Sequence, residues 1–307
     1  MTREEEFLKK QELFRRNAFL IITEMVAWSP VHPSELVDEV LHSIFFLGKF
    51  IIPQYNPESI LSDDDMLNTL KTVYPNPFQL YSSQLPKRSP VSCVLDMIVG
   101  ITGQENEGEI KECLQKLMLR LMQDDATYLI SSTICVSQLK NLSDSHRYYG
   151  VSMSTFGPMP GRIVTAASCL SYWDSCVAGA VMTYDFKKIK KTYFDGTIQL
   201  PENSVRCEAF SISRGTQMPP CRSCGNLFGL TTSEERQWPY GNCAEVESVS
   251  NLLKNETELK EQVRPTSETS TDVNRREAEE SVRKELMNCL KTVEFKWDEC
   301  FYTPKKR

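Results

Sequence analysis

The stretch from residue 219 to residue 245 contains three cysteines and one glutamate, and their spacing constrains the fold more than any other feature of the chain. The stretch opens with PPCRSC and closes with CAE. If a helix begins just after Pro220, Cys221 and Cys224 lie on one face of its first turn, beside backbone N–H groups without a partner in the helix. The helix dipole favours thiolate over thiol at this position. The spacing therefore predicts that both sulfurs can bind one metal ion.

Cys243 is expected at the start of a second helix. It follows the turn-like sequence WPYGN and precedes an amphipathic run with apolar residues at 246, 249, 252 and 253. Two helix starts can share one ion, so the sequence predicts Zn²⁺ bound by Cys221, Cys224 and Cys243. Three protein ligands with an open fourth position, taken by water, are the pattern of a catalytic zinc site.

Glu245 is the candidate catalytic residue. It lies two residues beyond Cys243, near the expected ion but poorly placed to ligate it together with its neighbour. A carboxylate at this position could exchange protons with a metal-bound water. Glu247, two residues further along the helix, is expected to point about 200° away and to take no part.

The Cys-Ala-Glu and Pro-Cys-x-x-Cys motifs together resemble the signature of the zinc-dependent cytidine deaminase-like superfamily. The resemblance implies hydrolytic deamination of a cytosine- or adenine-type base, with zinc hydroxide as nucleophile and Glu245 as proton shuttle. It implies a nucleobase-containing substrate, which could be a nucleoside, a nucleotide or a nucleic acid, and a possible homo-oligomer. The order of the two motifs is reversed relative to the family pattern.

The same resemblance implies an α/β fold with three layers, α/β/α. Residues 161–173 are similar to the first helix of the family, 177–184 to its first strand and 193–200 to its second strand. Both helix starts can present the same ligands in the reversed order. The placement of the later strands is left open by the reversal.

Two other interpretations of the cysteines remain open. Cys207 could complete a structural Cys₄ zinc site, in which Glu245 would be only a surface carboxylate. A chain of that kind would be a non-catalytic, zinc-stabilised interaction protein. Alternatively, Cys221 and Cys224 could form a thiol-redox pair. Arg222 could offset the negative charge of three thiolates, or it could be an ordinary solvated arginine.

The hydrophobic pattern divides the chain into four segments. Residues 1–150 are predicted to form an all-helical domain, with the last helix over 109–142 and a possible role in binding a protein partner. Residues 151–253 are predicted to form the deaminase-like zinc domain. Residues 254–276 are polar and without apolar periodicity, which favours a linker. Residues 277–307 are predicted to form a C-terminal helix and tail.

Composition excludes several classes of protein. With 307 residues and 40% hydrophobic content, the chain can form a sizeable core. Its most apolar run, 44–52, is shorter than the ~20 residues that span a bilayer. The charged start and the odd number of cysteines, 11, favour a reducing, cytoplasmic location, with the nucleus not excluded. The lysines at 187, 188, 190 and 191 indicate either a solvated hairpin tip or a nucleic-acid contact.

Overall fold

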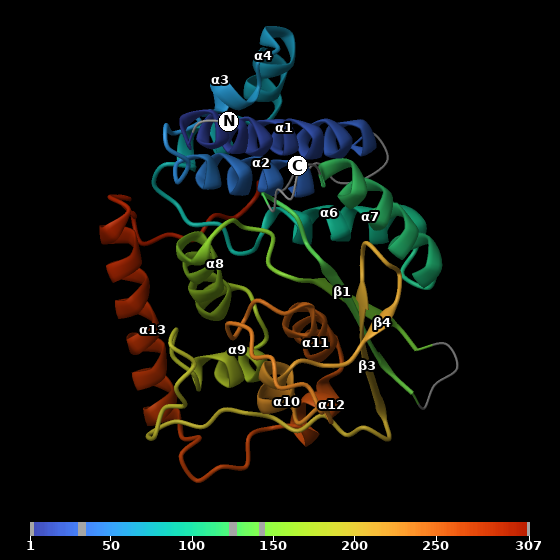
Figure 1. The fold of residues 1–307 in the computed structure, drawn as a ribbon. Helices are drawn as coiled ribbons and strands as arrows, with labels where there is room; N and C mark the ends of the chain where they lie inside the picture. Colours follow the sequence, from blue (N-terminus) through green and yellow to red (C-terminus); the bar gives the residue numbers. More distant parts are fainter. Residues whose placement is uncertain (1–2, 30–34, 123–127, 141–144, 306–307) are drawn as a thin grey trace.

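The structure is a computed structural model that describes residues 3–29, 35–122, 128–140 and 145–305. The first part of the chain is helical, and its helices form the upper part of the molecule in Figure 1. The helices are α1 (Arg3–Trp28), α2 (Glu35–Gly48), α3 (Pro57–Ile60), α4 (Asp64–Val73), α5 (Pro75–Leu80), α6 (Pro90–Thr102) and α7 (Glu107–Leu121). The helical prediction for this part of the chain is therefore confirmed as far as Leu121.

The helix predicted over 109–142 is confirmed as far as Leu121 but is wrong over Thr133–Leu139, and residues 123–127 and 141–142 of the prediction lie outside the described residues. Two strands follow instead, β1 (Thr133–Leu139) and β2 (Arg147–Val151). Strand β1 contains the β-branched residues Thr133, Ile134 and Val136, which favour a pleated conformation. The predicted all-helical domain over 1–150 thus contains one whole strand, and its boundary at residue 150 falls inside β2.

The two strands belong to a four-stranded antiparallel sheet. The strand order is β2-β1-β3-β4, with β3 at Val205–Ser211 and β4 at Gln217–Met218. Ile134 of β1 pairs with Val151 of β2 on one side and with Phe210 of β3 on the other. The sheet therefore joins segments that lie about 60 residues apart in sequence, with β1 as an inner strand.

Helix α11 (Ala244–Asn255) packs against one face of this sheet. The contact is close at Gly150, where an added Cβ would lie 2.3 Å from the Ser248 backbone nitrogen, so only glycine fits. The Ser248 hydroxyl donates to the Ser137 hydroxyl oxygen of β1 at 2.7 Å. This contact fixes the start of α11 relative to the inner strand.

The opposite face of the sheet is covered by α6 and α7. Tyr149 and Val151 alternate with Gly150, so they point away from α11 and join the apolar core that also contains α6. The Lys111 ammonium of α7 lies 3.6 Å from the ring centre of Phe210 on β3. Helices thus lie on both faces of a sheet, so the expected mixture of helix and sheet is confirmed, with all strands antiparallel.

Two elements expected from the family resemblance differ in the structure. Residues 161–173 fall largely in a helix, α8 (Pro158–Ser171), as expected, but 177–184 are mostly helix α9 (Ser175–Met182) rather than strand. Asp174 caps α9 by accepting a hydrogen bond from the Cys176 N–H at 2.8 Å. Residues 193–200 are not a strand of the sheet. The backbone N–H groups of Ile198 and Leu200 instead donate hydrogen bonds to the carbonyl groups of the last two residues of α10 (Arg222–Phe228).

The segment predicted as a polar linker, 254–276, is partly helical. It contains α12 (Thr257–Gln262) and the first turn of α13 (Asp272–Thr292), which Thr271 caps with a hydrogen bond from the Asn274 N–H. The predicted C-terminal helix is confirmed. Figure 1 shows α13 running along α8 and α9, and its apolar residues extend the core.

One apolar core runs through most of the molecule. It contains residues of the first helices, of β1 and β2, of α8 and of α13, from Phe14 to Phe295. After α13 the chain returns to the N-terminal helices, where Tyr302 donates its backbone N–H to Leu85 at 2.8 Å. Among the described helices, none combines the length and apolarity needed to cross a membrane.

Candidate metal centre

Cys221 and Cys224 are positioned by the start of α10. Cys221 is the N-cap residue, with an extended backbone (φ −73°, ψ 165°), and Cys224 lies in the first turn with no exposed surface. The helix ends at Gly229, whose positive φ of 67° suits glycine. The prediction that a helix begins after Pro220 is therefore confirmed, and both sulfurs lie at its N-terminal end.

Cys243 is the N-cap residue of α11, as the sequence predicted. The turn before it is closed by a hydrogen bond from the Asn242 N–H to the Pro239 carbonyl at 3.2 Å. Gly241 has a φ of +96°, and an added Cβ there would lie 2.5 Å from Thr165. The turn therefore requires glycine, and it brings the start of α11 beside the start of α10.

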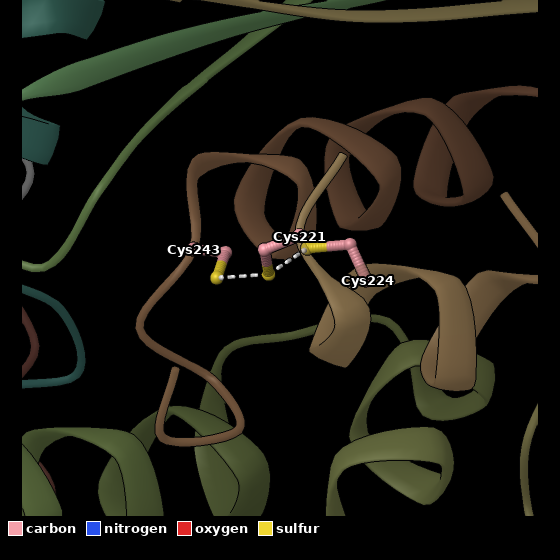
Figure 2. A group of neighbouring side chains, drawn as sticks. All are labelled: Cys221, Cys224 and Cys243. Atoms are coloured by element: carbon pink, nitrogen blue, oxygen red, sulfur yellow. Dashed lines mark hydrogen bonds between the residues drawn. The ribbon is translucent and has the colours of Figure 1, made fainter. Parts of the chain in front are cut away.

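The three sulfurs lie close enough to share one ion, as Figure 2 shows. The Cys221 sulfur is 3.7 Å from that of Cys224 and 3.5 Å from that of Cys243, and all three lie within 4.8 Å of one another. Sulfurs bound at about 2.3 Å to a tetrahedral zinc ion are about 3.8 Å apart. The donor set and its spacing fit a metal ion that accepts three thiolates.

Contacts among the sulfurs favour ionisation at one of them. Hydrogen bonding to Cys224, and then to Cys243, lowers the pKa of Cys221 to about 2. The same contact with Cys221 raises the pKa of the Cys224 and Cys243 thiols. A centre with one stable thiolate attracts a cation, and binding of a metal would release the protons of the other two thiols.

Glu245 shares a cleft with two of the three cysteines. The cleft has a volume of about 260 Å³, and its lining includes Cys221, Cys243, Glu245 and Trp238. The Glu245 side chain is 5% exposed. Burial raises the pKa of Glu245 to about 7, and the negative charge at Cys221 adds to this effect. A buried carboxyl group with such a pKa can both accept and donate a proton near neutral pH.

The wall of the cleft opposite α10 carries hydroxyl groups and apolar side chains. Ser152 accepts hydrogen bonds from the backbone N–H groups of Ser132 and Thr133, at 3.0 and 3.2 Å. Ile130, Met153 and Met218 supply apolar surface to the same cleft. The cleft thus combines apolar surface with a small number of polar groups, as ligand-binding clefts commonly do.

Cys207 lies outside the group of three sulfurs. It is on β3, and its sulfur is 3.7 Å from that of Cys135 on β1. The described residues that could hold a metal together are Cys221, Cys224 and Cys243 without it. The geometry therefore gives no support to a Cys₄ site. Arg222 is exposed, which agrees with the interpretation of this residue as a solvated arginine.

Glu247 was expected to point away from Glu245 and to take no part in the chemistry, and in the structure it is a buried side chain with a partner of its own. It is only 6% exposed, and its carboxylate accepts a hydrogen bond from the Val151 N–H at 3.0 Å. Burial raises the pKa of Glu247 to about 7, against the opposing charge of Arg88. Glu247 is buried because α11 is covered on several sides. A side chain that points about 200° away from Glu245 around the helix axis therefore meets another buried contact and not solvent.

Arg88 and Trp238 are residues of this region that sequence reasoning missed. Arg88 is buried, binds both carboxylate oxygens of Glu39 at 2.8 and 2.9 Å, and lines a small cavity of about 20 Å³ with Glu247 and Cys243. The sequence signal for Trp238 was its place in the turn before Cys243.

Searches of protein-family models, of curated proteins and of solved structures found no match to the chain.

Proposed function

We propose that this protein is a zinc-dependent hydrolytic deaminase that acts on a cytosine- or adenine-type base. The observation that carries the proposal is the shared cleft. Two of the three clustered cysteines and the buried Glu245 line the same cavity of about 260 Å³. Catalytic zinc sites combine three protein ligands with an open position, and a base deaminase also needs a carboxylate that is not a ligand beside it.

Each residue has a defined role in the proposed reaction. Cys221, Cys224 and Cys243 would hold the zinc ion, which would supply an activated water as nucleophile. Glu245 would take a proton from the attacking water and pass it to the ring nitrogen of the base. The water oxygen bonds to the ring carbon, the bond from that carbon to the exocyclic nitrogen breaks, and ammonia leaves. One proton of the water ends on the ring nitrogen next to that carbon, and the other ends on the leaving nitrogen.

The proposal extends to the fold. In this chain the helix that begins with Cys243 lies across the sheet, and the helix that begins after Cys221 meets it end to end at the sulfurs. A cytidine deaminase-like arrangement requires two helix starts at one ion beside a sheet. The reversed order of the motifs is compatible with this requirement, because either helix can come first in the chain.

The runner-up is a non-catalytic protein in which zinc only stabilises the fold. Three sulfurs and an open cleft beside Glu245 favour catalysis, because structural zinc is almost always held by four protein ligands. A thiol-redox function would need only Cys221 and Cys224, and it leaves the third sulfur at 3.5 Å without a role.

The test has two parts, both on the purified full-length chain. Metal analysis should give about one zinc per chain. Mass spectrometry should then detect a gain of about 1 Da in a member of a panel of nucleosides, nucleotides, RNA and single-stranded DNA. Zinc without conversion of any panel member would favour the structural role, and absence of metal would contradict both zinc hypotheses.

A further inference from the structure

Trp238 forms part of the rim of the cleft. Its side chain lines the cavity that contains Cys221, Cys243 and Glu245, yet 43% of its surface is exposed. In the described part of the chain, Trp238 is the aromatic residue among the exposed large apolar side chains. An indole ring at the entrance of a cleft offers a flat surface on which a nucleobase can stack.

The loop that carries Trp238 is held by the metal-bearing helix α10. The Arg222 N–H donates to the Arg236 carbonyl at 3.0 Å, and the Ser223 hydroxyl donates to the Trp238 carbonyl at 2.6 Å. The Gln237 amide donates to the Tyr240 hydroxyl at 2.7 Å. The backbone of Trp238 is therefore held in place relative to Cys221 and Cys224. A ligand that binds beside it does not have to order this loop, so the entropic cost of binding is lower.

Cationic side chains surround the same loop. The Arg236 guanidinium lies 3.9 Å from the ring centre of Trp238, and Arg236 is itself exposed. The Lys188 ammonium donates to the Gln237 carbonyl, which places Lys188 beside the loop. Arg222 is exposed on the adjoining turn. An aromatic ring flanked by arginine and lysine is the pattern of a surface for single-stranded nucleic acid.

We propose that the cleft acts on a base within a single-stranded nucleic acid, with Trp238 stacking on a base and Arg236, Lys188 and Arg222 contacting phosphates. The proposal rests on the proposed function of the same cleft. A free nucleoside carries no phosphate and would leave these cations without a ligand. A base paired inside a duplex could not enter the cleft without being flipped out.

The balance between stacking and charge can be estimated from the residues of the loop. Glu234 and Glu235 are exposed beside Arg236, so the net charge of the rim is small. Binding should therefore depend on salt only moderately. Each phosphate contact to a single strand contributes about −0.7 to the slope of log K against log salt concentration, so three contacts give about −2 at most.

The experiment measures binding by the zinc-loaded full-length Glu245→Gln protein, which should bind substrate without converting it. The probes are fluorescein-labelled single strands of RNA and of DNA, each about 12 nucleotides long and containing all four bases, with the matching duplex for comparison. Trp238→Leu should weaken single-strand binding by about 5- to 150-fold, and Trp238→Phe should restore most of it. Arg236→Ala should reduce the salt slope by about 0.7.

Arg283→Ala is the matched control. Arg283 also lies over a tryptophan ring, at 5.8 Å from the ring centre of Trp297, but neither residue lines the cleft. This variant should leave affinity and salt slope unchanged. Equal effects of Arg236→Ala and Arg283→Ala would overturn the proposal.

Two further outcomes separate this proposal from the proposed function. If the wild-type protein deaminates free nucleosides as efficiently as bases in the single strands, and Trp238→Leu and Arg236→Ala change neither, the nucleic-acid proposal fails while the deaminase stands. If single strands bind with the predicted dependence on Trp238 and Arg236 but no base is ever converted, the binding surface stands and the deaminase proposal fails.

Discussion

Glu245 and Glu247 lie two residues apart on α11 in different surroundings. Glu245 faces the cleft beside the sulfurs, whereas Glu247 binds the backbone of β2. We expect Glu245→Gln to retain zinc and fold, because glutamine has the same size and keeps much of the hydrogen bonding. Activity should fall by ~10⁴ or more, because general acid–base groups contribute ~10²–10⁴ and this residue serves both steps. Single-turnover rates of the wild-type and variant proteins provide the measurement.

Glu247 is unsuitable as the control for that experiment, because it is buried. Glu258 on α12 is exposed and lies away from the cleft lining. Glu258→Gln should therefore be nearly silent in activity and in stability. Equal activity of Glu245→Gln and Glu258→Gln, with zinc bound in both, would exclude the proposed role of Glu245.

The four candidate cysteines should separate into two groups when each is replaced by alanine. Removal of Cys221, Cys224 or Cys243 takes away one of three metal ligands, so zinc affinity should fall by more than about 100-fold and the melting temperature should fall with it. Cys207→Ala should leave zinc affinity unchanged, because its sulfur lies beside Cys135. Competition with a chelator gives the affinities. Loss of zinc in Cys207→Ala would favour the Cys₄ alternative instead.

At the scale of elements, the sequence predicted helix starts better than strands. The starts of α10 and α11 depend on local signals, which are prolines before Cys221 and a turn before Cys243. Strands β1 and β2 were missed because both faces of the sheet are covered, so apolar residues do not alternate cleanly with charged ones. The apolar run that forms α9 was taken for a strand, since a short buried run has no period that distinguishes the two.

The part of the candidate site that could be predicted from the sequence consists of residues close together in the chain. The three sulfurs and Glu245 belong to two short motifs, and the structure brings them together. The contributions of Arg88, Ser132 and Thr133 could not be predicted, because these residues reach the region only through long-range packing.

Glu107 connects α7 to the sheet, and its charge should make stability depend on pH. Its carboxylate accepts hydrogen bonds from Arg206 of β3 at 2.7 and 3.0 Å and from Lys111 at 2.8 Å. Burial opposes ionisation, but the bonds from Arg206 and Lys111 outweigh it and lower the pKa of Glu107 to about 2, from 4.5. Because the folded-state pKa is depressed, the stabilisation is complete above about pH 5 and is lost as the pH falls towards 2.

The variant Glu107→Gln tests this dependence. At pH 7 its free energy of unfolding should be lower than that of the wild type by about 1–3 kcal/mol, since the group is partly screened by solvent. The difference should shrink as the pH is lowered from 5 to 2. Urea titrations across that range give the free energies. A difference that stays constant with pH would show that the lost stability has another origin.

At the scale of the whole molecule, the N-terminal helices and α11 form one packed unit. Arg88 binds Glu39 of α2 on one side and the Tyr172 hydroxyl after α8 on the other, at 3.0 Å. It also shares a cavity with Glu247 of α11. A buried arginine that faces carboxylates from several helices holds them in one arrangement, because separating them would leave charges unpaired.

A domain boundary after residue 150, as predicted from the sequence, would allow residues 150–307 to fold alone and bind zinc, but the structure leads us to expect the opposite. The fragment would lack all of β1, an inner strand of the sheet, and most of β2. The face of α11 that packs on Ser137 and Gly150 would lose most of its support, and the edge of β3 would be exposed. We therefore expect an insoluble or zinc-poor fragment, whereas the full chain binds about one zinc. Co-expression of residues 1–149 with the fragment should restore solubility and zinc, since the two pieces together contain every residue of the sheet, although the cut divides β2. A soluble 150–307 fragment with full zinc occupancy would show instead that the metal centre does not need the sheet as observed.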